Sequence, residues 1–142
     1  MSYNIDGHSF YSKQEADRYL ALKRMKSKGE IQDFKVIAEP YVLVKAYNKC
    51  TTCGKVSGLS VCDLCGSKTY FSSGIVYRPN FLVQQNNGGM VIEDVMKSHK
   101  LSHEWNMKKI LYDQLYTTPV YIIVEGTPYH KTEKGWVRHE TT

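Results

Sequence analysis

The four cysteines of this chain fall into two Cys-x-x-Cys pairs, Cys50/Cys53 and Cys62/Cys65, with eight residues between the pairs. Each pair predicts a tight knuckle that aims two thiolates at one point, and two knuckles supply the tetrahedral set of sulfurs that zinc prefers. A glycine directly follows each pair, where it lets the backbone turn and donate N–H groups to the sulfurs. Because four thiolates close the coordination sphere, the spacing predicts a structural zinc ion with no open position for catalysis.

Two alternatives to the metal are a pair of disulfides and a redox-active dithiol. Thiols stay reduced in the cytoplasm, and the two symmetric knuckles favour a metal over either alternative. The segment 1–8 is polar and lacks the basic start and apolar stretch of a signal peptide. The longest apolar runs, such as 120–124, are too short to cross a membrane. We therefore expect a cytoplasmic protein whose zinc-binding insertion spans 49–68.

The chain of 142 residues is expected to form one domain, 1–142. Its hydrophobic content of 42% and charged content of 23% are typical of a globular protein with a core of its own. The net charge of +5 favours polyanionic partners, through phosphate contacts and the release of counterions. Eleven tyrosines add rings that can stack on bases, although most of them are expected to fill strand faces.

Turn and helix signals are clearest near the N-terminus. Asp6-Gly7 is typical of the tip of a hairpin. Ser12 and Glu15 form a capping box that starts a helix, and Gly29 predicts its end. A second helix is expected to start at Ser102, which is a suitable N-cap. Its predicted apolar side carries Met107, Ile110, Leu111 and Leu115.

The remaining segments read as strands joined by turn residues. The predicted strands are 34–37, 41–46, 74–84, 89–96 and 119–124, and a last hairpin is predicted within 127–140. Strand, helix and strand from Val91 to Tyr121 are typical of a parallel crossover. This order predicts an α/β fold in which helices flank a central mixed sheet, with the zinc knuckle inserted at the tip of a hairpin.

One stretch of the sequence carries a family resemblance. Residues 7–20, with Ser12-Lys13-Gln14-Glu15-Ala16 at their centre, resemble the opening hairpin and helix of a small phage and prophage family of uncharacterised proteins. That family lies within the PD-(D/E)XK nuclease superfamily. The resemblance covers most of 5–125 apart from the cysteine segment, and implies a core like that of restriction endonucleases. Its further segments are 28–31, Tyr77-Arg78-Pro79-Asn80-Phe81 and Val91-Ile92-Glu93-Asp94-Val95-Met96.

The resemblance also implies where a magnesium site would lie. In the superfamily, a helix Glu, a hairpin Asp and a second acid bind magnesium, which lowers the pKa of the attacking water, and a Lys assists the attack. The helix Glu matches Glu15 and the last acid matches Asp94, but the hairpin Asp falls on Asn80 and the Lys falls on Met96. The site is therefore expected to be degenerate, with magnesium binding doubtful.

Each retained acid has a second interpretation. Glu15 is equally well explained as the Glu of the capping box. Asp94 next to Glu93 is unusual for a buried strand, which favours the remnant of a site. Lys97 and Lys100 lie close to Met96 in sequence, but Lys97 is expected to point to the opposite face of the strand.

The leading hypothesis is a protein that binds DNA, or a partner that handles DNA, through a nuclease-like fold with a degenerate and inactive magnesium site. The alternatives are an active magnesium-dependent DNA endonuclease, as in phage DNA processing, and a zinc-ribbon adaptor that binds a protein. In the first two cases the protein would act in the host cytoplasm if a phage encodes it. The candidate phosphate contacts are Arg78, Lys97, Lys100, His103, Lys108 and Lys109, of which the last three also fit a solvated helix face.

Overall fold

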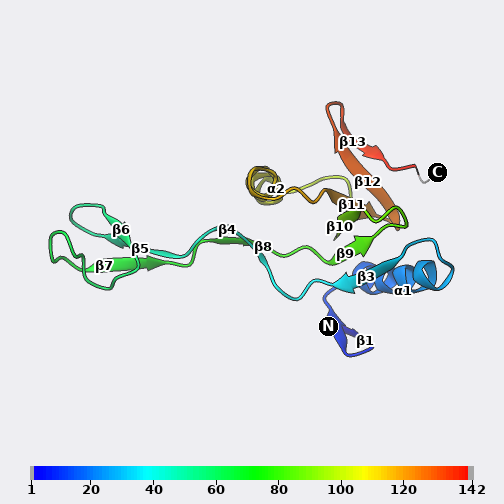
Figure 1. Cartoon of the computed structure of the whole chain (residues 1–142), viewed down its shortest axis with the longest axis horizontal. Coiled ribbons are helices and arrows are strands. Elements are labelled where there is room, and N and C mark those ends of the chain that lie inside the picture. The colour runs from blue at the N-terminus through cyan, green and yellow to red at the C-terminus, as the bar shows by residue number, and fades with distance from the viewer. Residues whose placement is uncertain (1, 141–142) are drawn as a thin grey trace.

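A computed structural model describes residues 2–140 (Figure 1). The chain opens with a hairpin of β1 (Tyr3–Ile5) and β2 (His8–Phe10), whose turn residues Asp6 and Gly7 both have positive φ. Helix α1 (Lys13–Ser27) follows, and the backbone N–H of Glu15 donates to the Ser12 hydroxyl at its N-cap. The predicted hairpin tip and helix start are therefore confirmed.

Six strands form the central sheet in the order β13-β12-β11-β10-β9-β3. Only β10 and β11 run parallel, and α2 (His103–Leu115) connects them as the predicted crossover. The sheet is therefore mixed, as expected. Its strands are β3 (Asp33–Val36), β9 (Phe81–Gln84), β10 (Met90–Met96), β11 (Val120–Val124), β12 (Thr127–Thr132) and β13 (Gly135–Arg138).

The two helices pack against opposite faces of the sheet. Side chains alternate between the faces of a strand, so Val91 and Ile92 of β10 belong to different cores. One core joins Val91 and Phe81 to Leu22 of α1. The other joins Ile92 to Tyr112 of α2 and to the pair of strands β4 (Tyr41–Val44) and β8 (Ile75–Tyr77). The α/β fold class predicted from the sequence is thus confirmed.

The segment 74–84 differs from the prediction of one strand. It forms two strands, β8 and β9, which pair with different partners, β4 and β3. Arg78-Pro79-Asn80 separates them. Proline has no N–H to donate to a strand ladder, so the strand breaks at Pro79 and the chain changes sheet there.

The apolar side predicted for α2 is also wrong in most of its members. Met107, Ile110 and Leu115 are exposed. The helix instead buries Tyr112 against Tyr41 and Tyr77, with Trp105 and Tyr116 at the edges of this aromatic cluster.

A long ribbon leaves the body of the protein and carries the cysteines at its tip (Figure 1). The ribbon continues from β4 and β8 into β5 (Tyr47–Cys50) and β7 (Thr69–Ser72), with β6 (Val56–Ser57) as a third strand. Gly74 marks the junction, where a Cβ would collide with the Val44 carbonyl oxygen. Neither helix in 2–140 is long and apolar enough to span a membrane.

Candidate functional site

The four cysteines converge at the tip of the ribbon. Their sulfurs all lie within 4.8 Å of one another, and the Cys50–Cys65 and Cys53–Cys62 Sγ pairs are 3.4 and 3.6 Å apart. These separations exceed an S–S bond of about 2.05 Å and approach the spacing of about 3.8 Å that a tetrahedral zinc–thiolate site implies. The cysteines are therefore not disulfide-bonded, and their arrangement fits one metal ion.

The two knuckles have the same backbone design. The N–H of Cys50 donates to the Lys55 carbonyl and that of Cys62 to the Ser67 carbonyl, at 2.9 and 2.8 Å. Gly54 and Gly66, at φ 76° and 78°, turn the chain within each loop. Positive φ is readily adopted only by glycine, which explains the residue type after each pair.

Hydrogen bonds favour the thiolates of Cys50 and Cys65. The backbone N–H groups of Cys53 and Thr52 lie 3.4 Å from the Cys50 Sγ and lower the pKa of that thiol. The side chain and backbone N–H of Ser67 lower the pKa of Cys65 to about 6. The pKa of Cys53 is instead raised to about 11, because the Lys55 backbone N–H, which lowers it, is outweighed by desolvation and by hydrogen bonds with the other three thiols. Among residues 2–140, this is the one cluster of three or more His, Cys, Asp or Glu side chains close enough to share an ion.

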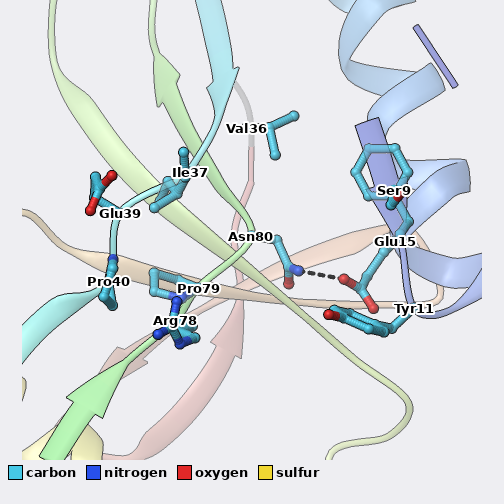
Figure 2. Close-up of a pocket in the computed structure, with 12 residues that line it drawn as sticks. Ser9, Tyr11, Glu15, Val36, Ile37, Glu39, Pro40, Arg78, Pro79 and Asn80 are labelled. Atoms are coloured by element: carbon cyan, nitrogen blue, oxygen red, sulfur yellow. Dashed lines mark hydrogen bonds between the residues drawn. The ribbon is translucent and has the colours of Figure 1, made fainter. Parts of the chain in front are cut away.

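A second candidate site is a cavity of about 410 Å³ between β2, α1 and the two loops that follow β3 and β8. Figure 2 shows the side chains of Glu15 and Asn80 joined by a hydrogen bond at this cavity, with Tyr11 beside Glu15 and Arg78 farther from Glu15. The Nδ2 of Asn80 donates to Glu15 Oε1 at 2.7 Å. The structure thus brings together two of the residues that the resemblance assigned to a magnesium site.

Each polar atom of Asn80 makes at least one hydrogen bond in this position. Its Oδ1 accepts from the Val95 N–H at 2.8 Å, its backbone N–H donates to the Glu93 carbonyl, and its carbonyl accepts from the Ile37 N–H. Asn80 therefore ties α1, β10 and the loop after β3 to one another. An aspartate here would place a second carboxylate against Glu15, whereas the amide needs no cation between them.

Asp94 lies on the other face of β10 from Glu93 and is buried. Its Oδ2 accepts from the Tyr77 hydroxyl at 2.6 Å and from Trp105 Nε1 at 2.9 Å. Burial raises the pKa of the Asp94 carboxyl, and the negative charge of Glu15 raises it further, although both hydrogen bonds act in the opposite direction. Asp94 is thus held by two aromatic donors and is not one of the residues that line the cavity.

Met96 is the last residue of β10, where it is half-buried and pairs in register with Val124. Glu93 is bound by Arg18 of α1, whose Nε and Nη2 donate to the two carboxylate oxygens at 2.6 and 2.7 Å. Both side chains of this pair are buried. One of the two adjacent acids in β10 is therefore neutralised by an ion pair and the other is held by neutral donors.

The chain matches a protein family over residues 2–131, and the description of that family is "Protein of unknown function (DUF1064)". The chain belongs to this family. The match spans the cysteine ribbon and the body of the DUF1064 chain up to β12, without β13. Comparison with curated proteins and with solved structures finds no match.

The six predicted phosphate contacts of the DUF1064 chain fall into two groups. Lys97, Lys100 and His103 are exposed between β10 and the start of α2, and Arg78 is exposed at the cavity. Within α2, Lys108 pairs with Glu104 at 3.3 Å and Lys109 with Asp113 at 2.6 Å. Of these six predicted contacts, only the residues of the first group therefore have no acidic partner among the described residues.

Sequence reasoning missed Arg18, Tyr77, Trp105 and Tyr11 as parts of these sites. The sequence contained a signal for Arg18. Glu93 and Asp94 are adjacent acids in an apolar strand, and a buried carboxylate is usually paired with a base. No comparable signal existed for Tyr77 and Trp105. Their donor groups reach Asp94 from a different strand and from the crossover helix.

Proposed function

We propose that the DUF1064 chain binds DNA through its body, that this body is a nuclease-like fold with a degenerate magnesium site, and that its cysteines hold one structural zinc ion. The resemblance to PD-(D/E)XK nucleases supplies the expectation for the body. The observation that carries the proposal is the Asn80–Glu15 hydrogen bond. Magnesium would bridge these two positions in an active site, whereas here the amide and the carboxylate bind each other without a cation.

The choice of zinc rests on the donor set. Four thiolates are soft ligands in a tetrahedral arrangement, which zinc prefers over magnesium or calcium. The closed set leaves no place for a reacting water, so the ion is structural. Its role in the DUF1064 chain is to hold the tip of a ribbon that has few buried apolar side chains of its own.

We expect one zinc ion per chain in protein purified without added metal, measured by elemental analysis. Cys53→Ser should lower this ratio towards zero, because a hydroxyl is a poor replacement for a thiolate ligand. It should loosen the tip while the thermal transition of the body persists, since both cores lie outside the ribbon tip. Thr52→Ser is a matched control that leaves all four ligands in place. A metal ratio near zero in the unmodified chain would contradict the zinc proposal.

The proposed DNA surface consists of Lys97, Lys100 and His103 with Arg78 nearby. A net charge of +5 gives the whole chain an attraction to phosphate, and Arg78 lines the cavity that contains Glu15 and Asn80. Phosphate contacts release counterions, so binding should weaken steeply as salt is raised.

We expect Lys97→Gln with Lys100→Gln to weaken duplex DNA binding and to flatten the salt dependence by about two units, at roughly one unit per lost phosphate contact. Fluorescence anisotropy with a labelled duplex at several salt concentrations measures both effects. Lys108→Gln with Lys109→Gln removes the same charge from cations that already have acidic partners, and should change the slope less. Equal slopes for the unmodified chain and the Lys97/Lys100 variant would rule out this surface.

A further inference from the structure

The ribbon tip presents two chemically different faces. Figure 1 shows that β5, β6 and β7 lie apart from the central sheet and from both helices. In β5, Lys49 lies opposite Tyr70 of β7 and Val56 of β6, so these three side chains share one face, which we call the Lys49 face. Cys50 alternates with Lys49 along β5 and therefore belongs to the other face, together with Phe71.

Neither face is covered by the rest of the protein. Tyr70 is 51% exposed and Phe71 is 65% exposed. An exposed aromatic ring on a strand is a usual platform for an unpaired base, and every base has a π-face to stack on it. The two adjacent rings therefore provide similar apolar platforms on opposite sides of one strand.

Charge distinguishes the two faces. The ribbon from 45 to 72 contains four lysines and a single acid, Asp63, which is occupied by Lys55 at 2.6 Å. In the described residues, Lys45, Lys49 and Lys68 have no acidic partner. The Cys50 thiolate, which belongs to the metal site, lies on the face opposite Lys49. The Lys49 face therefore combines a cation and an exposed ring without a carboxylate that pairs with Lys49 in the described residues, which suits a phosphate followed by its base.

We propose that the Lys49 face binds single-stranded nucleic acid, with an unpaired base stacked on Tyr70 and the adjoining phosphate held by Lys49. This extends the proposed function, because it adds a second binding surface of different specificity far along the ribbon from the body. The body contacts duplex phosphates, whereas the ribbon tip takes a strand whose bases are free. A DUF1064 chain with both surfaces suits junctions between duplex and single-stranded DNA.

The test uses the full chain with its metal and a fluorescently labelled oligothymidylate of about 12 nucleotides, within the site sizes typical of such surfaces. Tyr70→Ala should weaken binding by about 5- to 150-fold, which corresponds to the loss of one stacked base. Tyr70→Phe should retain binding, because stacking needs the ring and not the hydroxyl. Lys49→Gln should weaken binding and reduce its salt dependence by about one unit.

Two control variants separate stacking on Tyr70 from a general loss of apolar surface at the tip. Phe71→Ala removes an exposed ring from the opposite face, and Leu64→Ser removes an apolar side chain that is 72% exposed at the second knuckle. Both should leave binding to the oligonucleotide unchanged, and zinc content should be equal in all variants. A protein-docking ribbon would instead depend on Leu64 and Phe71.

The inference is overturned if the unmodified chain does not bind the oligonucleotide, or if Tyr70→Ala has no larger effect than Phe71→Ala. Duplex binding measured on the same variants separates this inference from the proposal for the body. Tyr70-dependent binding of single strands without duplex binding sustains the ribbon surface and rejects the body surface. Duplex binding that depends on Lys97 and Lys100, without any effect of Tyr70, does the reverse.

Discussion

Asn80→Asp combined with Met96→Lys is expected to give the chain magnesium-dependent DNA cleavage, at least about 100-fold above the activity of the unmodified chain. The first change adds a carboxylate that binds magnesium together with Glu15. The second adds a cation near the charge that develops during attack by water. Loss of a single such group typically costs on the order of 10²–10³ in rate. Cleavage of supercoiled plasmid at several magnesium concentrations measures the gain.

The geometry supplies a second measurement that does not depend on activity. In Asn80→Asp alone, two carboxylates would meet where Asn80 Nδ2 and Glu15 Oε1 are now 2.7 Å apart. Their repulsion should lower thermal stability, and magnesium should restore it because a ligand that binds only the folded state stabilises that state. The unmodified chain should show no such response to magnesium.

Further variants locate the activity in the proposed site. Glu15→Ala or Asp94→Ala in the restored background should abolish cleavage. Strong cleavage by the unmodified chain that is lost in Asp94→Ala would instead establish an active endonuclease with a rearranged site. A restored variant that neither cleaves DNA nor responds to magnesium would remove the basis for the nuclease-like interpretation of Glu15 and Asn80.

Breaking the buried Arg18–Glu93 pair is expected to cause a large loss of stability, comparable to truncating a core side chain. Removing one partner of such a pair leaves an uncompensated buried charge and typically costs about 3–5 kcal/mol, from a total of roughly 5–15 kcal/mol for a domain. We therefore expect Arg18→Met and Glu93→Gln each to lower the free energy of unfolding by about that amount. Urea unfolding followed by far-ultraviolet circular dichroism measures it.

The control is an exposed ion pair on the same helix. Lys13 and Asp17 form an i,i+4 pair at 3.0 Å, and both side chains are largely exposed. Lys13→Met should change the free energy of unfolding by less than about 1 kcal/mol. The double variant Arg18→Met with Glu93→Gln should lose less than the sum of the two single changes, because it leaves no unpaired charge in the core. If Arg18→Met cost no more than Lys13→Met, the pair would have no role in holding α1 to the sheet.

The features that the sequence predicted correctly are those whose causes lie within a few residues. Asp6-Gly7 sets its own turn, Ser12 caps the helix that begins beside it, and each cysteine knuckle closes over a short loop. The order of strand, helix and strand was also sufficient for the parallel pairing of β10 and β11. In each case the local backbone has few alternatives once these residue types are present.

Tertiary structure decided which side chains meet. The sequence predicted an aliphatic side for α2, but the surface formed by β4 and β8 packs against the ring of Tyr112 and leaves Ile110 exposed. The contacts of Asn80 with Glu15 and of Arg18 with Glu93 join residues 65 and 75 positions apart. Such pairings depend on how the sheet places distant segments against one another. The order of residue types along the chain does not by itself show which distant segments meet.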